Sequence, residues 1–107
     1  MKNRKDTENI KPFTLYVPES GYKKFIVYVP NYETGRLKKV MFGDNRYEDY
    51  TIHKDKERRY RYWVRHSNDK IEDPYSSGFW SMYTLWGVSN NLNTAFKDSV
   101  KRAKKLI

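Results

Sequence analysis

In the first half of the chain, the pattern of hydrophobic and polar residues is typical of β-strands. Apolar, β-branched and aromatic residues fill the segments 13–17, 24–29 and 36–42, a composition typical of β-strands. Pro18 and Pro30 follow the first two segments, and the turn-forming residues 31–35 separate the last two. This pattern predicts an antiparallel hairpin over residues 24–42, preceded by a short strand at 13–17.

Beyond Thr51 the pattern changes to the period of an α-helix, about 3.6 residues. A helix over residues 55–66 is predicted, because Asp55 and Glu57 stand where a helix N-terminus favours negative charge. A short helix is expected to follow, capped by Ser76 or Ser77 and ended by Gly87. Its apolar residues recur at helical spacing: Phe79, Met82, Tyr83 and Trp86.

A last helix is predicted near the C-terminus, with Ser89 or Asn90 as its cap. One narrow stripe of this helix is apolar or small: Leu92, Ala95, Phe96, Ser99, Val100 and Ala103. Its other faces carry basic residues, among them Lys97, Lys101, Arg102, Lys104 and Lys105. No internal repeat or low-complexity tract interrupts the chain.

These elements define an α+β fold, with a small antiparallel sheet from the N-terminal half packed against two or three helices from the C-terminal half. A chain of 107 residues suffices for one core but not for two. Residues 1–12 are polar and are expected to form a flexible basic arm, which leaves residues 13–107 as a single domain. Aromatic residues make up 17% of the chain, and we expect them to build much of the core.

The net charge of the chain indicates what kind of partner it binds. Lys and Arg number 22 against 13 Asp and Glu, so the formal net charge is +9. Such an excess favours binding to something anionic, most commonly nucleic acid, although lysines can also serve only to solvate a surface. The sequence has no cysteine, which excludes a disulfide framework and a thiolate zinc site and fits a reducing compartment. Neither a signal-peptide pattern nor a membrane span is apparent.

The helix predicted over residues 55–66 separates into two unlike faces at 100° per residue. Tyr60, Trp63 and Val64 share one face and are expected to pack inward. The opposite face, which we call the basic face, consists of Arg58, Arg61, Tyr62, Arg65 and His66. Guanidinium groups suit phosphate and an interleaved tyrosine can stack on a base. The same arginines could instead be solvated, or paired internally with Asp44, Glu48 and Asp49.

Signals for catalysis are weak. His53, Asp55 and His66 could be imagined in a nuclease or a metal site, but their spacing does not supply a complete ligand set. Glycine-rich phosphate loops and serine nucleophile motifs are absent. We therefore expect no enzymatic activity, no cofactor, no metal and no small-molecule substrate, and ordinary hydrogen-bonding roles for both histidines. Trp80 and Trp86 are expected in the core, the alternative being that one of them is exposed as a stacking platform or interface anchor.

The middle of the chain also resembles a known family. The resemblance covers roughly residues 42–86 and is carried by Phe42-Gly43-Asp44, Tyr47, Asp49-Tyr50-Thr51, His53, Asp55, Arg58, Arg61-Tyr62, Arg65-His66, Gly78-Phe79-Trp80-Ser81 and Leu85-Trp86. These residues are similar to those of a family of small proteins encoded by large and giant nucleocytoplasmic DNA viruses, which has no assigned activity. The resemblance implies a viral origin, with a location in the virion or in the host cytoplasm. The hairpin region and the C-terminal helix lie outside it and are expected to be specific to this protein.

Two functions remain open from the sequence. The first is a small non-enzymatic viral protein that binds the phosphate backbone of nucleic acid, for example in genome packaging. Its expected contacts are the basic face of the helix over residues 55–66 together with Lys97, Lys101, Lys104 and Lys105 of the last helix. The alternative is a minor virion or capsid structural protein that cements acidic protein surfaces. Neither function requires a membrane.

Overall fold

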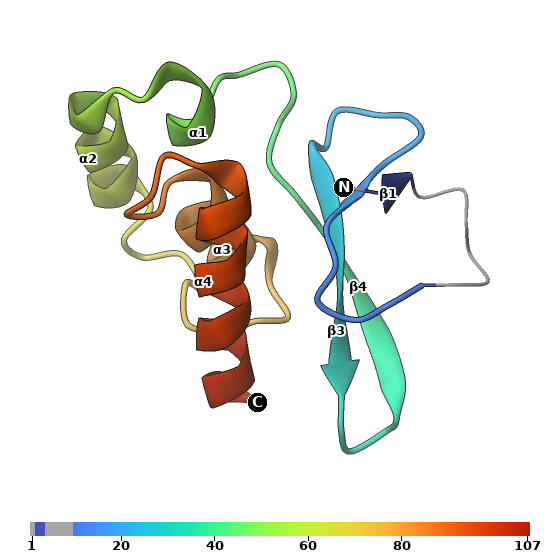
Figure 1. Ribbon diagram of the computed structural model, residues 1–107. Helices are drawn as coiled ribbons and strands as arrows, with labels where there is room; N and C mark the ends of the chain where they lie inside the picture. The colour runs from blue at the N-terminus through green and yellow to red at the C-terminus, as the bar shows by residue number, and fades with distance from the viewer. Residues whose placement is uncertain (1, 4–9) are drawn as a thin grey trace.

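The strands form one sheet on one side of the molecule, and the helices cover one face of it (Figure 1). The computed structural model describes residues 2–3 and 10–107. Within these residues the sheet has four strands in the order β1-β2-β3-β4, with β1 at Lys2–Asn3, β2 at Tyr16–Val17, β3 at Phe25–Asn31 and β4 at Arg36–Phe42. The predicted α+β class is confirmed, with the sheet in the N-terminal half and the helices in the C-terminal half.

The predicted hairpin is confirmed as the pair β3 and β4. The two strands are antiparallel and remain in register from Phe25 opposite Phe42 to Asn31 opposite Arg36. The prediction that the first strand of the hairpin ends before Pro30 is wrong, because β3 continues to Asn31. Among the described residues, β2 pairs with β3 at Tyr16 opposite Ile26, away from Pro30, and proline is tolerated in a strand where its missing N–H is not required by a neighbour.

The strand predicted over residues 13–17 is shorter than expected. Only Tyr16–Val17 pair with neighbouring strands, antiparallel to β3 and parallel to β1. Phe13 has a positive φ of 55° and donates its backbone N–H to the Tyr28 carbonyl, which takes it out of the extended conformation. Of the expected arm, residues 1 and 4–9 lie outside the described residues.

Five helical segments follow the sheet: α1 at Tyr50–His53, α2 at Lys56–Arg65, α3 at Ser77–Trp80, the π-helix η1 at Ser81–Leu85, and α4 at Leu92–Leu106. The helix predicted over residues 55–66 is confirmed as α2, with Asp55 as its N-cap. The helix predicted from Ser76 or Ser77 is confirmed with Ser76 as its cap. Its second half winds as a π-helix, and α1 was not predicted.

The cap of α4 differs from the expectation. Asn91 occupies the N-cap position and its side chain accepts a hydrogen bond from the Thr94 N–H. Ser89 instead accepts a hydrogen bond from the Asn91 N–H, so it supports the loop before the helix rather than the helix itself. The predicted stripe does face the core, where Ala95, Ser99 and Ala103 are buried.

The two faces of the sheet bury different side chains, because successive residues of a strand point to opposite sides. Val27 and Val29 face the helices and join a core that contains Phe42, Phe79 and Trp80. On the opposite face, a second cluster is formed by Tyr16, Ile26 and Tyr28, with Ile10 and Met41 packed against it. The larger core therefore holds the helical layer against the sheet.

Candidate binding pocket between the sheet and α2

Two aspartate side chains cap the helices α1 and α2 and so determine where α2 begins. Asp49 caps α1 by accepting from the Thr51 N–H, and Asp55 caps α2 by accepting from the N–H groups of Glu57 and Arg58. Between the two helices, Lys54 adopts a left-handed conformation with φ 57° and ends α1. The pair of aspartates thus places α2 directly after a one-turn helix.

The face by which α2 contacts the rest of the protein includes Trp63, as predicted, but otherwise differs from the prediction. The Arg59 guanidinium donates hydrogen bonds to the carbonyls of Trp86 and Gly87, and the Trp63 indole N–H donates to the Trp86 carbonyl. Tyr62 stacks on Trp86, with ring centroids 4.2 Å apart and planes within 4° of parallel.

The prediction that Tyr60 and Val64 pack inward is wrong, since they are 67% and 58% exposed. A prediction from apolar character alone therefore placed the contact face of α2 about one residue away from its true position. The reason is that the surface that α2 contacts consists of backbone carbonyls and an indole ring. Such a surface selects a guanidinium and aromatic rings over aliphatic side chains.

A pocket of about 730 Å³ opens between α2 and the end of the sheet. α2 and its C-cap contribute all five residues of the basic face, Arg58, Arg61, Tyr62, Arg65 and His66. The sheet end and the following loop contribute residues 23–24, 43–44 and 47–49, and Ser81, Leu85 and Trp86 complete the lining. The structure therefore brings the whole predicted face to one concave site.

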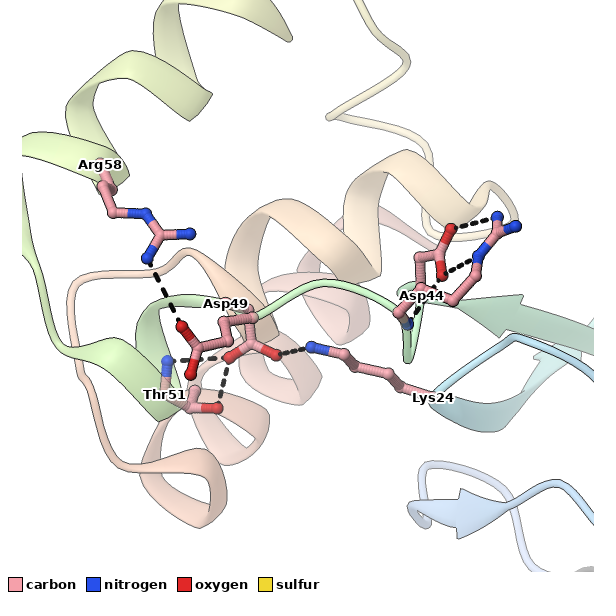
Figure 2. Close-up of polar contacts among 7 residues, drawn as sticks. Lys24, Asp44, Asp49, Thr51 and Arg58 are labelled. Carbon is pink, nitrogen blue, oxygen red and sulfur yellow. Dashed lines mark hydrogen bonds and ion pairs between the residues drawn. The ribbon is translucent and has the colours of Figure 1, made fainter.

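The carboxylates of this pocket are each engaged by a cation (Figure 2). Asp49 is almost completely buried and its carboxylate pairs with Lys24 Nζ at 2.5 Å. The same carboxylate accepts from the Thr51 N–H and hydroxyl.

Asp44 forms two side-chain contacts with the Arg46 guanidinium, at 3.0 and 2.7 Å. Hydrogen bonding to Arg46 lowers the pKa of Asp44 to about 2. Glu48 lies 3.6 Å from the Arg58 guanidinium, so the predicted internal pairing of the arginines holds for Arg58. Asp44 and Asp49 are thus neutralised by hydrogen-bonded cations of the protein, whereas the pair of Glu48 with Arg58 is longer and exposed.

Three cationic side chains at the pocket have no strong ion pair within the described residues and can therefore bind an external anion. Lys23 and Arg65 form no ion pair with any described residue. Arg61 approaches Glu57 at 4.0 Å, but both side chains are largely exposed, and an exposed pair at this separation contributes little. The pocket therefore combines internally neutralised acids with a cationic rim.

An aromatic column crosses the pocket. The Tyr62 ring lies between Trp86 and His66, each 4.2 Å from it between centroids, and the His53 ring lies 5.3 Å from Trp86 at the far end. Burial raises the pKa of Tyr62 to about 12, so its hydroxyl stays protonated. Burial also lowers the pKa of His53 below its usual 6.5. At the other end, His66 is partly exposed and its Nδ1 lies 2.8 Å from Asp69.

The basic residues of α4 lie apart from this pocket. Lys101 and Lys105 line a separate hollow with Arg102, whose guanidinium lies 4.2 Å from the Tyr83 ring centroid. Lys104 lies 5.4 Å from the Phe13 ring centroid, and Lys97 is exposed. The predicted binding residues of α4 therefore do not line the pocket at α2, and two of them, Lys101 and Lys105, line a separate hollow.

The two histidines take part in local hydrogen bonds, as predicted. His53 Nδ1 accepts from the Asp55 N–H, while His66 contacts Asp69. The described residues contain no cluster of three or more His, Cys, Asp or Glu side chains that could hold a metal ion. Within the same residues, no helix is both long enough and apolar enough to cross a membrane.

The two candidate tryptophans have different environments. Trp80 is fully buried and its indole N–H donates to the Pro74 carbonyl, so the alternative of an exposed platform is wrong for Trp80. Trp86 is partly exposed and lines the pocket through its stack on Tyr62.

Sequence reasoning missed the contribution of the sheet to this site. Lys23 and Lys24 line the pocket, although they are far from α2 in the sequence and belong to no motif. The acidic residues Asp44, Glu48 and Asp49 were identified only as possible partners of the arginines. No local pattern could have located Lys23 here, because its position follows from the packing of the sheet on the helical layer.

Fold and site together define a small α+β protein with a cation-rimmed aromatic pocket. Residues 13–66 match the model of a family of unknown function (DUF5754), and the chain belongs to this family. The match includes the hairpin, so the expectation that the hairpin is specific to this protein is wrong; α4 lies beyond the match. No curated protein matches the chain, and no solved structure matches it.

Proposed function

We propose that this is a non-enzymatic nucleic-acid-binding protein that contacts the phosphate backbone through the cationic rim of the pocket. The observation that supports it most is the contrast between paired and unpaired charges. Lys24 is used within the protein, in a buried pair with Asp49, whereas Lys23, Arg61 and Arg65 line the same hollow without a buried partner. Cations that fold stability does not use are available to an anionic ligand.

The chemistry of the rim suits phosphate. A guanidinium donates two parallel hydrogen bonds to two oxygens, which phosphate accepts well. Binding of this kind releases counterions from the nucleic acid, so the affinity falls as salt rises, with a slope of about 0.9 per phosphate contact on duplex DNA and about 0.7 on single strands. The net charge of +9 adds a long-range attraction.

The test compares two doubly substituted variants with equal net charge. Arg61→Gln/Arg65→Gln removes two rim cations, and Arg36→Gln/Lys38→Gln removes two exposed cations from β4. Dissociation constants for fluorescent DNA and RNA are measured across a salt series. We expect the rim variant to reduce the slope of log K against log salt by roughly 1 to 2, in line with the loss of two contacts, and the β4 variant to change it less.

The proposal fails if the wild-type protein binds neither DNA nor RNA at low salt. It also fails if the two variants have the same effect, because the binding would then follow net charge and not the pocket. Circular dichroism of each variant establishes that the fold is retained before the comparison is made.

A second candidate function is a minor virion protein that cements acidic protein surfaces. It is favoured by the outward side of α2, where the exposed Tyr60 and Val64 flank Arg61. Aromatic residues and arginine are enriched in protein interfaces. The likeness of residues 42–86 to proteins of large DNA viruses supports a viral setting for either function, and detection of the protein in purified virions, crosslinked to genome or to capsid, distinguishes them.

A further inference from the structure

The aromatic column runs from Trp86 through Tyr62 to His66. Trp86 stacks on Tyr62 at the inner end, and the His53 ring lies 5.3 Å from Trp86 with the two planes tilted by 52°. At the other end, the His66 ring stacks on Tyr62 by one face, is partly exposed, and lines the pocket. A further flat ring can extend the column by stacking on the other face of His66. The flat rings of nucleic acid are its bases, which stack well on aromatic side chains.

The dimensions of the site suit a single nucleotide unit. A pocket of about 730 Å³ falls within the usual range for small-molecule sites, about 300–1,000 Å³. A base in a duplex is stacked on both sides and paired at its edge, so it cannot enter such a hollow without being extruded from the helix. A base in a single strand is free to do so.

The pocket that would receive the base is lined by cations that can meet its phosphates. Lys23, Arg61 and Arg65 lie at the pocket together with Tyr47, whose ring is mostly exposed. The carboxylates of Asp44 and Asp49 are held by Arg46 and Lys24, so they oppose a nearby phosphate less than free acids would. Backbone phosphates on either side of an inserted base would therefore meet cations.

We infer that the pocket binds one unstacked base of a single-stranded nucleic acid, stacked on His66, with the flanking phosphates on Arg61, Arg65 and Lys23. The protein accordingly prefers single strands to duplexes. This inference rests on the proposed function, because it assumes that the cationic rim binds nucleic acid.

The experiment uses the full chain and three probes with equal numbers of phosphates: an oligothymidine, a duplex, and an abasic strand that has the same backbone without bases. Fluorescence anisotropy gives the dissociation constant of each at one salt concentration. We expect the oligothymidine to bind about tenfold or more tighter than the abasic strand, which is the scale of one base–aromatic stack, and tighter than the duplex. Equal affinity for the oligothymidine and the abasic strand would overturn the inference.

Substitution of His66 supplies the second readout. His66→Ala should weaken binding of the oligothymidine and leave the abasic strand unchanged, while His66→Phe, which keeps a ring, should retain the preference for bases. If His66→Ala weakens both probes equally, the ring does not stack on a base and the inference is wrong. A wild-type protein that binds none of the three probes contradicts the proposed function itself, so the two failures are distinguishable.

Discussion

At the scale of single residues, Asp49 connects the two layers of the fold. Its buried carboxylate contacts Lys24 of the sheet half and caps α1 through Thr51. Replacing Asp49 with Ala leaves Lys24 without its partner in a mostly buried position, which typically costs about 3–5 kcal/mol. We expect a loss of this size in the free energy of unfolding, measured by urea denaturation.

The matched control for Asp49 is Asp44, which pairs with Arg46 in an exposed position. Asp44→Ala should lower the free energy of unfolding much less than Asp49→Ala does, because an exposed ion pair contributes little. Similar losses for the two substitutions would show that burial of the Lys24–Asp49 pair is not what makes it important.

His53 makes the stability depend on pH. Burial lowers its pKa in the folded protein below the value of 6.5 expected in the unfolded chain. Around and below pH 6.5 the unfolded state therefore binds more protons, and the stability rises with pH. We expect the free energy of unfolding to fall as the pH drops through this range, because protonation at Nδ1 also breaks the hydrogen bond from the Asp55 N–H.

The comparison that tests this dependence is His53→Gln, which cannot titrate. Urea denaturation of both proteins on either side of pH 6.5 should show that the difference in stability between wild type and variant changes with pH. A constant difference would mean that His53 does not contribute to the pH dependence.

At the scale of elements, Gly43 allows the sheet and η1 to approach each other at the pocket. Gly43 has a φ of 78°, and a Cβ there would lie 2.8 Å from Leu85 Cδ1 and 3.1 Å from Lys24 Cβ. Gly21 has a similar φ of 88° but open space around its Cα. Each Ala substitution incurs the left-handed conformational cost of about 1–2 kcal/mol, and only Gly43→Ala must also displace neighbouring side chains.

We therefore expect Gly43→Ala to lower the melting temperature more than Gly21→Ala does. Equal changes would indicate that backbone conformation alone accounts for both glycines. The comparison isolates the close packing of β4 against η1 because the two positions share the same conformational requirement.

At the scale of the whole molecule, the positive charge is divided between two surfaces. The basic face lines the pocket, whereas Lys97, Lys101, Lys104 and Lys105 belong to α4 and do not line it. Charges outside the pocket raise affinity through the long-range field without contacting a base. Replacing the four α4 lysines with Gln should therefore weaken binding to single strands, duplexes and abasic strands alike and reduce the salt dependence.

The preference for single strands should survive this change. Its loss in the α4 variant would indicate that α4 contacts the base and that the pocket is not sufficient. The same anisotropy series with the three probes measures both quantities.

Some elements of this fold could be predicted from the local sequence pattern and others could not. The hairpin and α2 were predictable, since the β3–β4 register follows from strand-like residues around a turn and α2 begins at an aspartate cap. α1 was missed because it is a single turn, too short to show a helical period. The contact face of α2 was predicted wrongly because its partners are the carbonyls of Trp86 and Gly87, which hydrophobicity does not describe.

The amino-acid sequence by itself determined the α+β class, the net charge and the five residues of the basic face, because periodicity and charge are local or additive properties. Only the tertiary structure decided that Lys23, Gly43 and Trp86 join that face in one pocket, that Arg58 is internally paired while Arg65 is not, and that α4 lies apart. These outcomes depend on which distant segments pack together. Packing of the sheet on the helical layer is a property of the whole chain and leaves no signal within any one segment.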